Sequence, residues 1–105
     1  MNIKWMLTQD VQADASPGPD FTAFDDEKVI GRVYQVEHGA DRGVWFWEMT
    51  FEQPGPVPAH RTSGRAAERA KAGRCVIQAY RRLLEQPPPA RVAKRRLTAL
   101  KQART

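Results

Sequence analysis

The side chains that could perform chemistry are few and come from separate segments of the chain. Cys75, together with His38 and His60, would supply the nucleophile and the base of a covalent mechanism. A thiol between Arg74 and Val76 of a helical pattern is, however, more typical of a small core or boundary residue. One cysteine cannot close an intrachain disulfide, and two distant histidines do not complete a zinc site with it. We therefore expect no metal centre.

Acidic and glycine-rich stretches are equally poor candidates for a reaction centre. Asp25, Asp26 and Glu27 are adjacent in a predicted turn, where carboxylates are normally solvated, and no second acidic cluster is placed to work with them. The glycines of "GADRG" do not lead from a strand into a helix, as a phosphate-binding loop does. We expect a protein that is not an enzyme, with no catalytic residue, no cofactor and no small-molecule substrate.

Charge is the stronger signal, because the total of +5 hides an asymmetry. Residues 1–57 carry four basic and ten acidic side chains, whereas residues 58–105 carry thirteen basic and two acidic ones. A basic half is typical of proteins with an acidic partner, although the two halves could also neutralise each other within the fold. The candidate residues for binding nucleic acid or another acidic partner are Arg74, Arg81, Arg82, Arg91, Lys94, Arg95 and Arg96.

Aromatic residues gather in "GVWFWEMTF", residues 43–51, which holds two of the three tryptophans and two of the four phenylalanines. If this stretch is a strand, Trp45, Trp47, Met49 and Phe51 share one wholly apolar face. We expect that face in the core, where its large rings would meet the small residues Ala70 and Gly73 of a helix. An exposed platform for stacking on a flat partner such as a base is the alternative. Tyr34 and Phe46 are predicted to form an exposed aromatic surface on the opposite face.

Three strand-like segments and one helix must position these side chains. Residues 21–24, 29–37 and 44–51 are rich in β-branched and aromatic residues, and the glycines of "HGADRG" favour a hairpin between the last two. The prolines of "QPGPVP" end the third strand. The sequence therefore predicts an α+β fold: a three-stranded antiparallel sheet packed on one main helix, with a basic C-terminal helix or tail.

The helix is predicted from an apolar stripe that begins after these prolines. Thr62 or Ser63 would cap it, and Pro87 would stop it. The stripe consists of Ala66, Ala70, Gly73, Ile77, Tyr80 and Leu84, widened by Val76, Ala79 and Leu83. We divide the chain into a loosely ordered leader (1–20), a β-β-β-α domain (21–86) and a proline-started basic helix or tail (87–105). No apolar run is long enough for a membrane span or a signal peptide, so we expect a cytoplasmic protein without a membrane partner.

The segments also carry a resemblance. "DFTAFDDEKVIGRVY", then "WFWEM", then a helix that ends in "AY", resembles a group of short uncharacterised proteins of alphaproteobacteria, rhizobia among them, with "GRVY" and "WFW" strands. It covers residue 20 to about residue 84 and departs in "EQPGPVPAHRTSG" and in the basic tail. The resemblance implies these segment boundaries and no activity. The function we expect is a small noncatalytic binding domain for a macromolecular partner, a protein rather than a nucleic acid, with nucleic-acid binding through the basic helix and tail as the alternative.

The basic tail gives the first testable prediction. Residues 90–105 carry six basic residues, no acidic residue and a thin apolar seam, so they bury too little apolar area to offset the entropy of ordering them. Deleting them should leave the melting temperature nearly unchanged and abolish any binding to acidic surfaces. The alternative is a second packed helix held by Leu97 and Leu100. Strong protection of the amides of residues 92–100 from hydrogen exchange in the free protein would contradict a disordered arm.

Overall fold

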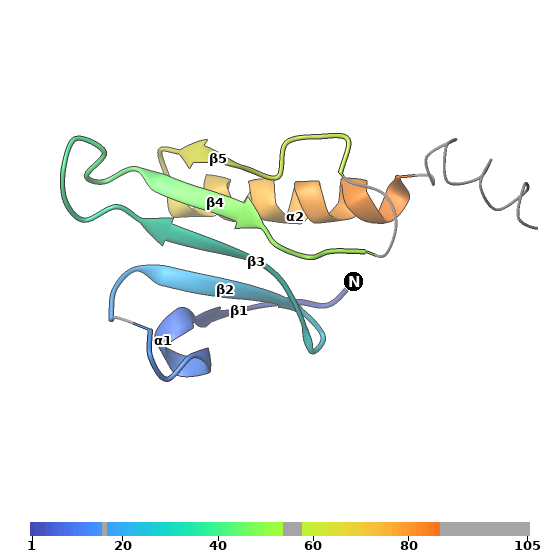
Figure 1. Ribbon diagram of the computed structural model, residues 1–105, viewed down its shortest axis with the longest axis horizontal. Helices are drawn as coiled ribbons and strands as arrows, with labels where there is room; N and C mark the ends of the chain where they lie inside the picture. The colour runs from blue at the N-terminus through green and yellow to red at the C-terminus, as the bar shows by residue number, and fades with distance from the viewer. Residues whose placement is uncertain (16, 54–57, 87–105) are drawn as a thin grey trace, which may run out of the picture.

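The computed structural model describes residues 1–15, 17–53 and 58–86 of the 105-residue chain, and these form one sheet with one long helix (Figure 1). The sheet is antiparallel throughout, and its strands follow one another in the order of the sequence. The elements are β1 (Ile3–Leu7), α1 (Thr8–Val11), β2 (Asp20–Asp25), β3 (Lys28–Gln35), β4 (Trp45–Met49), β5 (Ser63–Ala66) and α2 (Arg69–Glu85).

The predicted three-stranded sheet is wrong, because the sheet has five strands. β2, β3 and β4 lie in the three predicted segments, and β1 and β5 add one strand at each edge. β1 lies within residues 1–20, which the sequence analysis assigned to a leader. Its side chains alternate between half-buried and exposed, with Ile3, Trp5 and Leu7 directed inward. The sequence "IKWML" alternates only in part, because the exposed Met6 is also apolar, so the strand signal there is weak.

β5 has no comparable signal, since "SGRA" contains no β-branched or aromatic residue. Its small residues are needed because Trp47 lies opposite Gly64. A Cβ on Gly64 would come within 2.9 Å of the indole Nε1 of Trp47. Ser63 therefore belongs to a strand and caps no helix, and the helix begins at Arg69 rather than near Ala66.

The backbone of α2 lies against β3, β4 and β5 and not against β1 and β2 (Figure 1). Only one side of the predicted stripe is buried: Tyr80 and the widening residues Val76, Ala79 and Leu83 lie in the core, whereas Ala70 and Leu84 are exposed and Gly73 and Ile77 are half-buried. The residues that α2 buries are Ala72, Val76, Ala79, Tyr80 and Leu83. The apolar surface of the helix is therefore wider than the part that the sheet covers.

The ring-bearing face of β4 is confirmed as part of the core. Trp47 and Met49 are buried, and Trp45 and Phe51 are partly buried against the same cluster. The expected contact of Gly73 with the tryptophans of β4 is wrong, however. The atoms nearest to a Cβ placed on Gly73 belong to Trp5 of β1, at 3.3 Å, and not to the tryptophans of β4.

Gly31 of β3 allows the helix to approach the centre of the sheet. A Cβ at this buried position would lie 2.4 Å from Cγ1 of Val76 and 2.7 Å from the carbonyl oxygen of Glu48. No carbon atom fits at those distances, so any side chain here would push the helix away or distort the β3–β4 pairing.

Substituting Gly31→Ala should lower the free energy of unfolding by about 1–3 kcal/mol, because the new methyl group overpacks the interface between α2 and β3. Chemical denaturation measures this. Combining Gly31→Ala with Val76→Ala removes one of the two clashes, so the two substitutions should be non-additive, with part of the stability recovered. Strict additivity, or a Gly31→Ala variant as stable as the parent, would contradict the close contact.

Candidate functional site

The predicted basic residues that can be placed lie together on the outer side of α2. Arg74, Arg81 and Arg82 are exposed, and they line a shallow depression of about 700 Å³ with Lys71, Gln78 and Glu85. None of the three arginines forms a salt bridge within the described part of the chain. The other four predicted residues, Arg91, Lys94, Arg95 and Arg96, lie outside the described residues.

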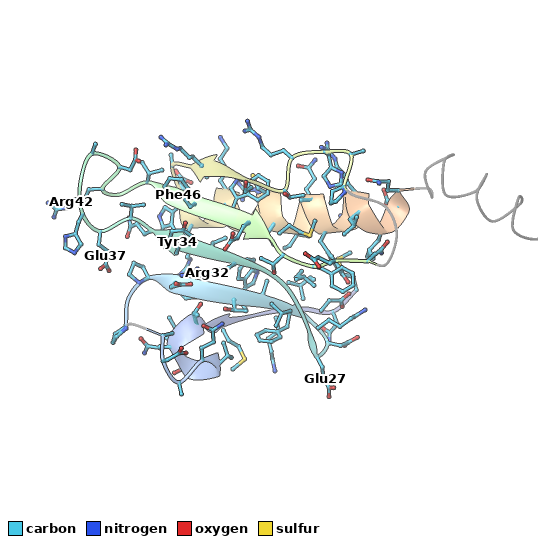
Figure 2. All side chains as sticks on the ribbon, viewed as in Figure 1. Glu27, Arg32, Tyr34, Glu37, Arg42 and Phe46 are labelled. Carbon is cyan, nitrogen blue, oxygen red and sulfur yellow. The ribbon has the colours of Figure 1, made fainter. Side chains whose placement is uncertain are left out.

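Tyr34 and Phe46 face each other across β3 and β4 on the side of the sheet opposite α2 (Figure 2). Their rings stack with centroids 5.7 Å apart and planes 14° from parallel. A guanidinium lies over each ring: that of Arg32 is 4.6 Å from the centroid of Tyr34, and that of Arg65 is 5.2 Å from the centroid of Phe46. Both aromatic side chains are half-buried by these neighbours.

Acidic groups already neutralise the two arginines of this face. Arg32 forms a two-pronged ion pair with Asp20, which also accepts a hydrogen bond of 2.6 Å from the hydroxyl of Thr8. Burial opposes ionisation of Asp20, but the hydrogen bonds from Arg32 and Thr8 outweigh it and lower the pKa of this carboxyl. Arg65 pairs with Asp41 at 3.2 Å. The open face is thus a polar network with satisfied charges, which fixes the start of α1 on β2.

A groove on the other side of the sheet is lined mainly by apolar residues. It has a volume of about 750 Å³ and runs beside the first half of α2, over the strands that the helix leaves uncovered. Trp5 and Leu7 of β1, Phe21 of β2 and Val33 of β3 line it from the sheet, and Ala70, Gly73 and Ile77 line it from the helix. Its charged residues are the exposed Arg69, Arg74 and Asp10.

The sequence stripe that the sheet does not use is the helical wall of this groove. Ala70, Gly73 and Ile77 are spaced i, i+3 and i+7, so they lie on one side of α2, and the exposed Leu84 continues the line. At the groove's end, the guanidinium of Arg69 lies 4.8 Å from the ring centroid of Phe21. Sequence reasoning found these helix residues and assigned them to the core. It missed Trp5, Leu7 and Phe21.

A buried hydrogen-bond network holds β1 in place beside this groove. The hydroxyl of Tyr80 donates to one carboxylate oxygen of Asp25 at 2.6 Å, and the backbone N–H of Asn2 donates to the other at 2.9 Å. The bonds from Asn2 and Tyr80 lower the pKa of Asp25. Burial and the bond to Asp25 raise the pKa of Tyr80 to about 12. One carboxylate therefore joins β2 to α2 and to the residue that precedes β1.

The residues first considered for catalysis, His60, Cys75 and His38, lie in three different segments. A ring nitrogen of His60, Nε2, lies 2.9 Å from the backbone carbonyl oxygen of Ala79. Cys75 is a half-buried free thiol on α2, and His38 is exposed in the β3–β4 loop. Within the described ranges, no three His, Cys, Asp or Glu side chains gather so that they could hold a metal ion. No helix in the same ranges has the length and apolar character that crossing a membrane requires.

Comparison of the chain with protein-family models, with curated proteins and with solved structures finds no match.

Substituting Tyr80→Phe should lower the unfolding free energy by about 1–3 kcal/mol at neutral pH, because Asp25 stays buried and loses a donor. The pKa of Tyr80 in the folded state is about 12, above its ordinary value of 10.0. The stability from this group is therefore complete below about pH 10 and is lost as the pH rises toward 12. Denaturation curves at both ends of this window measure the loss, which the Tyr80→Phe variant should lack. Tyr34→Phe, which keeps the ring stacked on Phe46, is the control. Equal effects of the two substitutions would contradict the assignment.

Proposed function

We propose that this chain is a small noncatalytic binding domain and that its partner is a protein seated in the groove between β1 and α2. One observation carries the proposal: the backbone of α2 lies against β3, β4 and β5 of the five-stranded sheet, and α2 meets β1 and β2 only through side chains such as Tyr80 on Asp25 and Trp5 beside Gly73. Strands lie about 4.8 Å apart and a helix with its side chains is about 10 Å wide, so one helix covers about half of such a sheet. Trp5, Leu7 and Phe21, which line the groove over β1 and β2, are apolar and half-buried, and contiguous apolar surface typically marks an interaction site.

The exposed positions of the charged groups around the groove favour a protein segment over a small molecule as the ligand. The charged groups Asp10, Arg69 and Arg74 are exposed, whereas small-molecule sites place a few polar groups so that they converge inside a largely enclosed pocket. The stacked rings of Tyr34 and Phe46 are a weaker candidate, because Arg32 and Arg65 already occupy their faces. The free thiol of Cys75 suits a reducing cytoplasm.

Nucleic-acid binding is the second candidate, supported by the exposed arginines of α2. Arg74, Arg81 and Arg82 line one depression and have no salt bridge within the part of the chain that the structure covers. Phosphate contacts by such a row would make binding to arbitrary duplex DNA fall steeply as salt concentration rises. The acidic residues of the sheet side, Asp20, Asp41 and Glu48 among them, disfavour contacts between phosphates and the open face. The proposed kinship with short alphaproteobacterial proteins adds no activity to either candidate.

Photocrosslinking in the native cell separates the two candidates. A benzophenone side chain replaces Ala70 in the groove or Gln78 in the depression of the basic arginines, both exposed positions of α2. We expect an adduct of one defined mass at residue 70 that resists nuclease and is destroyed by protease, and a much weaker one at residue 78. A nuclease-sensitive adduct confined to residue 78, or no adduct at residue 70, would overturn the protein-binding proposal.

A further inference from the structure

The wall of the groove on α2 is long enough for about two turns of a second helix in the same layer. This wall extends from Arg69 to Ile77, which at 1.5 Å per residue is about 12 Å, or a little over two turns. Ala70 is exposed and has a small side chain, so a neighbouring helix can approach α2 closely there, while the Trp5 ring already lies against Gly73. Trp5 already bridges from β1 toward Gly73 and supplies a broad apolar floor. An amphipathic helix laid beside α2 would therefore complete a two-layer arrangement of helices on the sheet.

The charged residues beside the groove indicate which charges a docked helix should carry. Arg69 and Arg74 are exposed on the α2 side, and neither has an acidic partner among the residues placed here. Further along the same helix lie the exposed Arg81 and Arg82. A docked helix with carboxylates along the side that faces α2 would meet these guanidinium groups, and one with lysines there would be repelled. Asp10, from α1, is the one acidic residue of the lining.

Neither helix within residues 1–15, 17–53 and 58–86 supplies such an occupant. α1 has four residues, and the outer side of α2 is basic, so a second copy would bring arginines to arginines. Residues 90–105 carry six basic residues and no acidic one, so their charge also disfavours the α2 side of the groove. The complementary occupant is a segment of a different protein.

We propose that the groove binds an amphipathic helix of a partner protein whose apolar face covers Trp5, Gly73 and Ile77 and whose flank toward α2 is acidic. The inference rests on the proposed function and specifies the partner's chemistry: apolar residues at helical spacing, with glutamate or aspartate beside them. A partner segment of any other structure or charge in the same groove would leave the proposed function intact and would overturn the inference of an acidic amphipathic helix.

The test uses the full-length chain and a fluorescent synthetic peptide of about 15 residues, long enough to form a helix on binding. One peptide has leucines along one face with flanking glutamates, a second replaces the glutamates by lysines, and a third scrambles the first. Fluorescence anisotropy should show that the glutamate peptide binds at least about tenfold more tightly than the other two. Equal affinity for the glutamate and lysine peptides would refute the charge selection.

Two pairs of variants locate the site. Arg74→Glu, in the groove, should weaken binding of the glutamate peptide about five- to tenfold and strengthen binding of the lysine peptide. Arg82→Glu makes the same change of net charge outside the groove lining and should alter the affinity for both peptides much less. Gly73→Leu should abolish binding by filling the space beside Trp5, whereas Gln78→Leu on the outer side of α2 should not. Circular dichroism checks that each variant is folded. Equal losses in Arg74→Glu and Arg82→Glu would mean that the outer side of α2 binds the peptide, and would overturn the proposal. If Gly73→Leu perturbs the fold, Ala70→Glu serves instead, and it should weaken the glutamate peptide selectively.

Discussion

Gly31 lets α2 lie directly against the centre of the sheet, and the positions of the remaining layers follow from that close contact. With no Cβ at Gly31, Val76 enters the space above β3, and Tyr80 comes close enough to donate its hydrogen bond to Asp25. The same approach fixes α2 over β3, β4 and β5. A helix centred there is too narrow to lie over all five strands, and it meets β1 and β2 only through side chains such as Tyr80. The tight packing of one half of the sheet and the open groove over the other half thus have one cause.

The two faces of the sheet satisfy their side chains in different ways. On the open face, ion pairs and stacked rings complete one another: Asp20 neutralises Arg32, and Arg32 in turn lies over Tyr34 (Figure 2). Few polar or charged side chains described on that face lack a hydrogen-bond or ion-pair partner. On the helix face the side chains are mainly apolar, and most of them are buried in the core that α2 completes. Trp5 and Ile77 remain partly exposed beside exposed arginines. This contrast directs the functional proposal to the helix face.

Strand prediction succeeded where side chains are both apolar and β-branched or aromatic, and failed at the two edges. The pattern of β4 placed Trp47 and Met49 in the core because alternation alone decides which side of a strand a residue faces. β1 has only five residues, and its exposed Met6 is apolar, so its pattern predicts a strand weakly. β5 forms because Trp47 needs a glycine opposite it, which is a property of two segments and cannot be seen in either.

The sequence by itself determined the class of the fold, the faces of the central strands, the existence of one long helix and the basic character of its outer side. These follow from local periodicity and charge, which act within one element. Tertiary structure decided how many strands join the sheet, which part of the wide apolar arc of α2 is buried, and that Trp5 rather than Trp45 or Trp47 lies beside Gly73. Those outcomes depend on how closely two elements approach. The candidate groove belongs to this second kind, because it exists only where β1, β2 and α2 meet without covering one another.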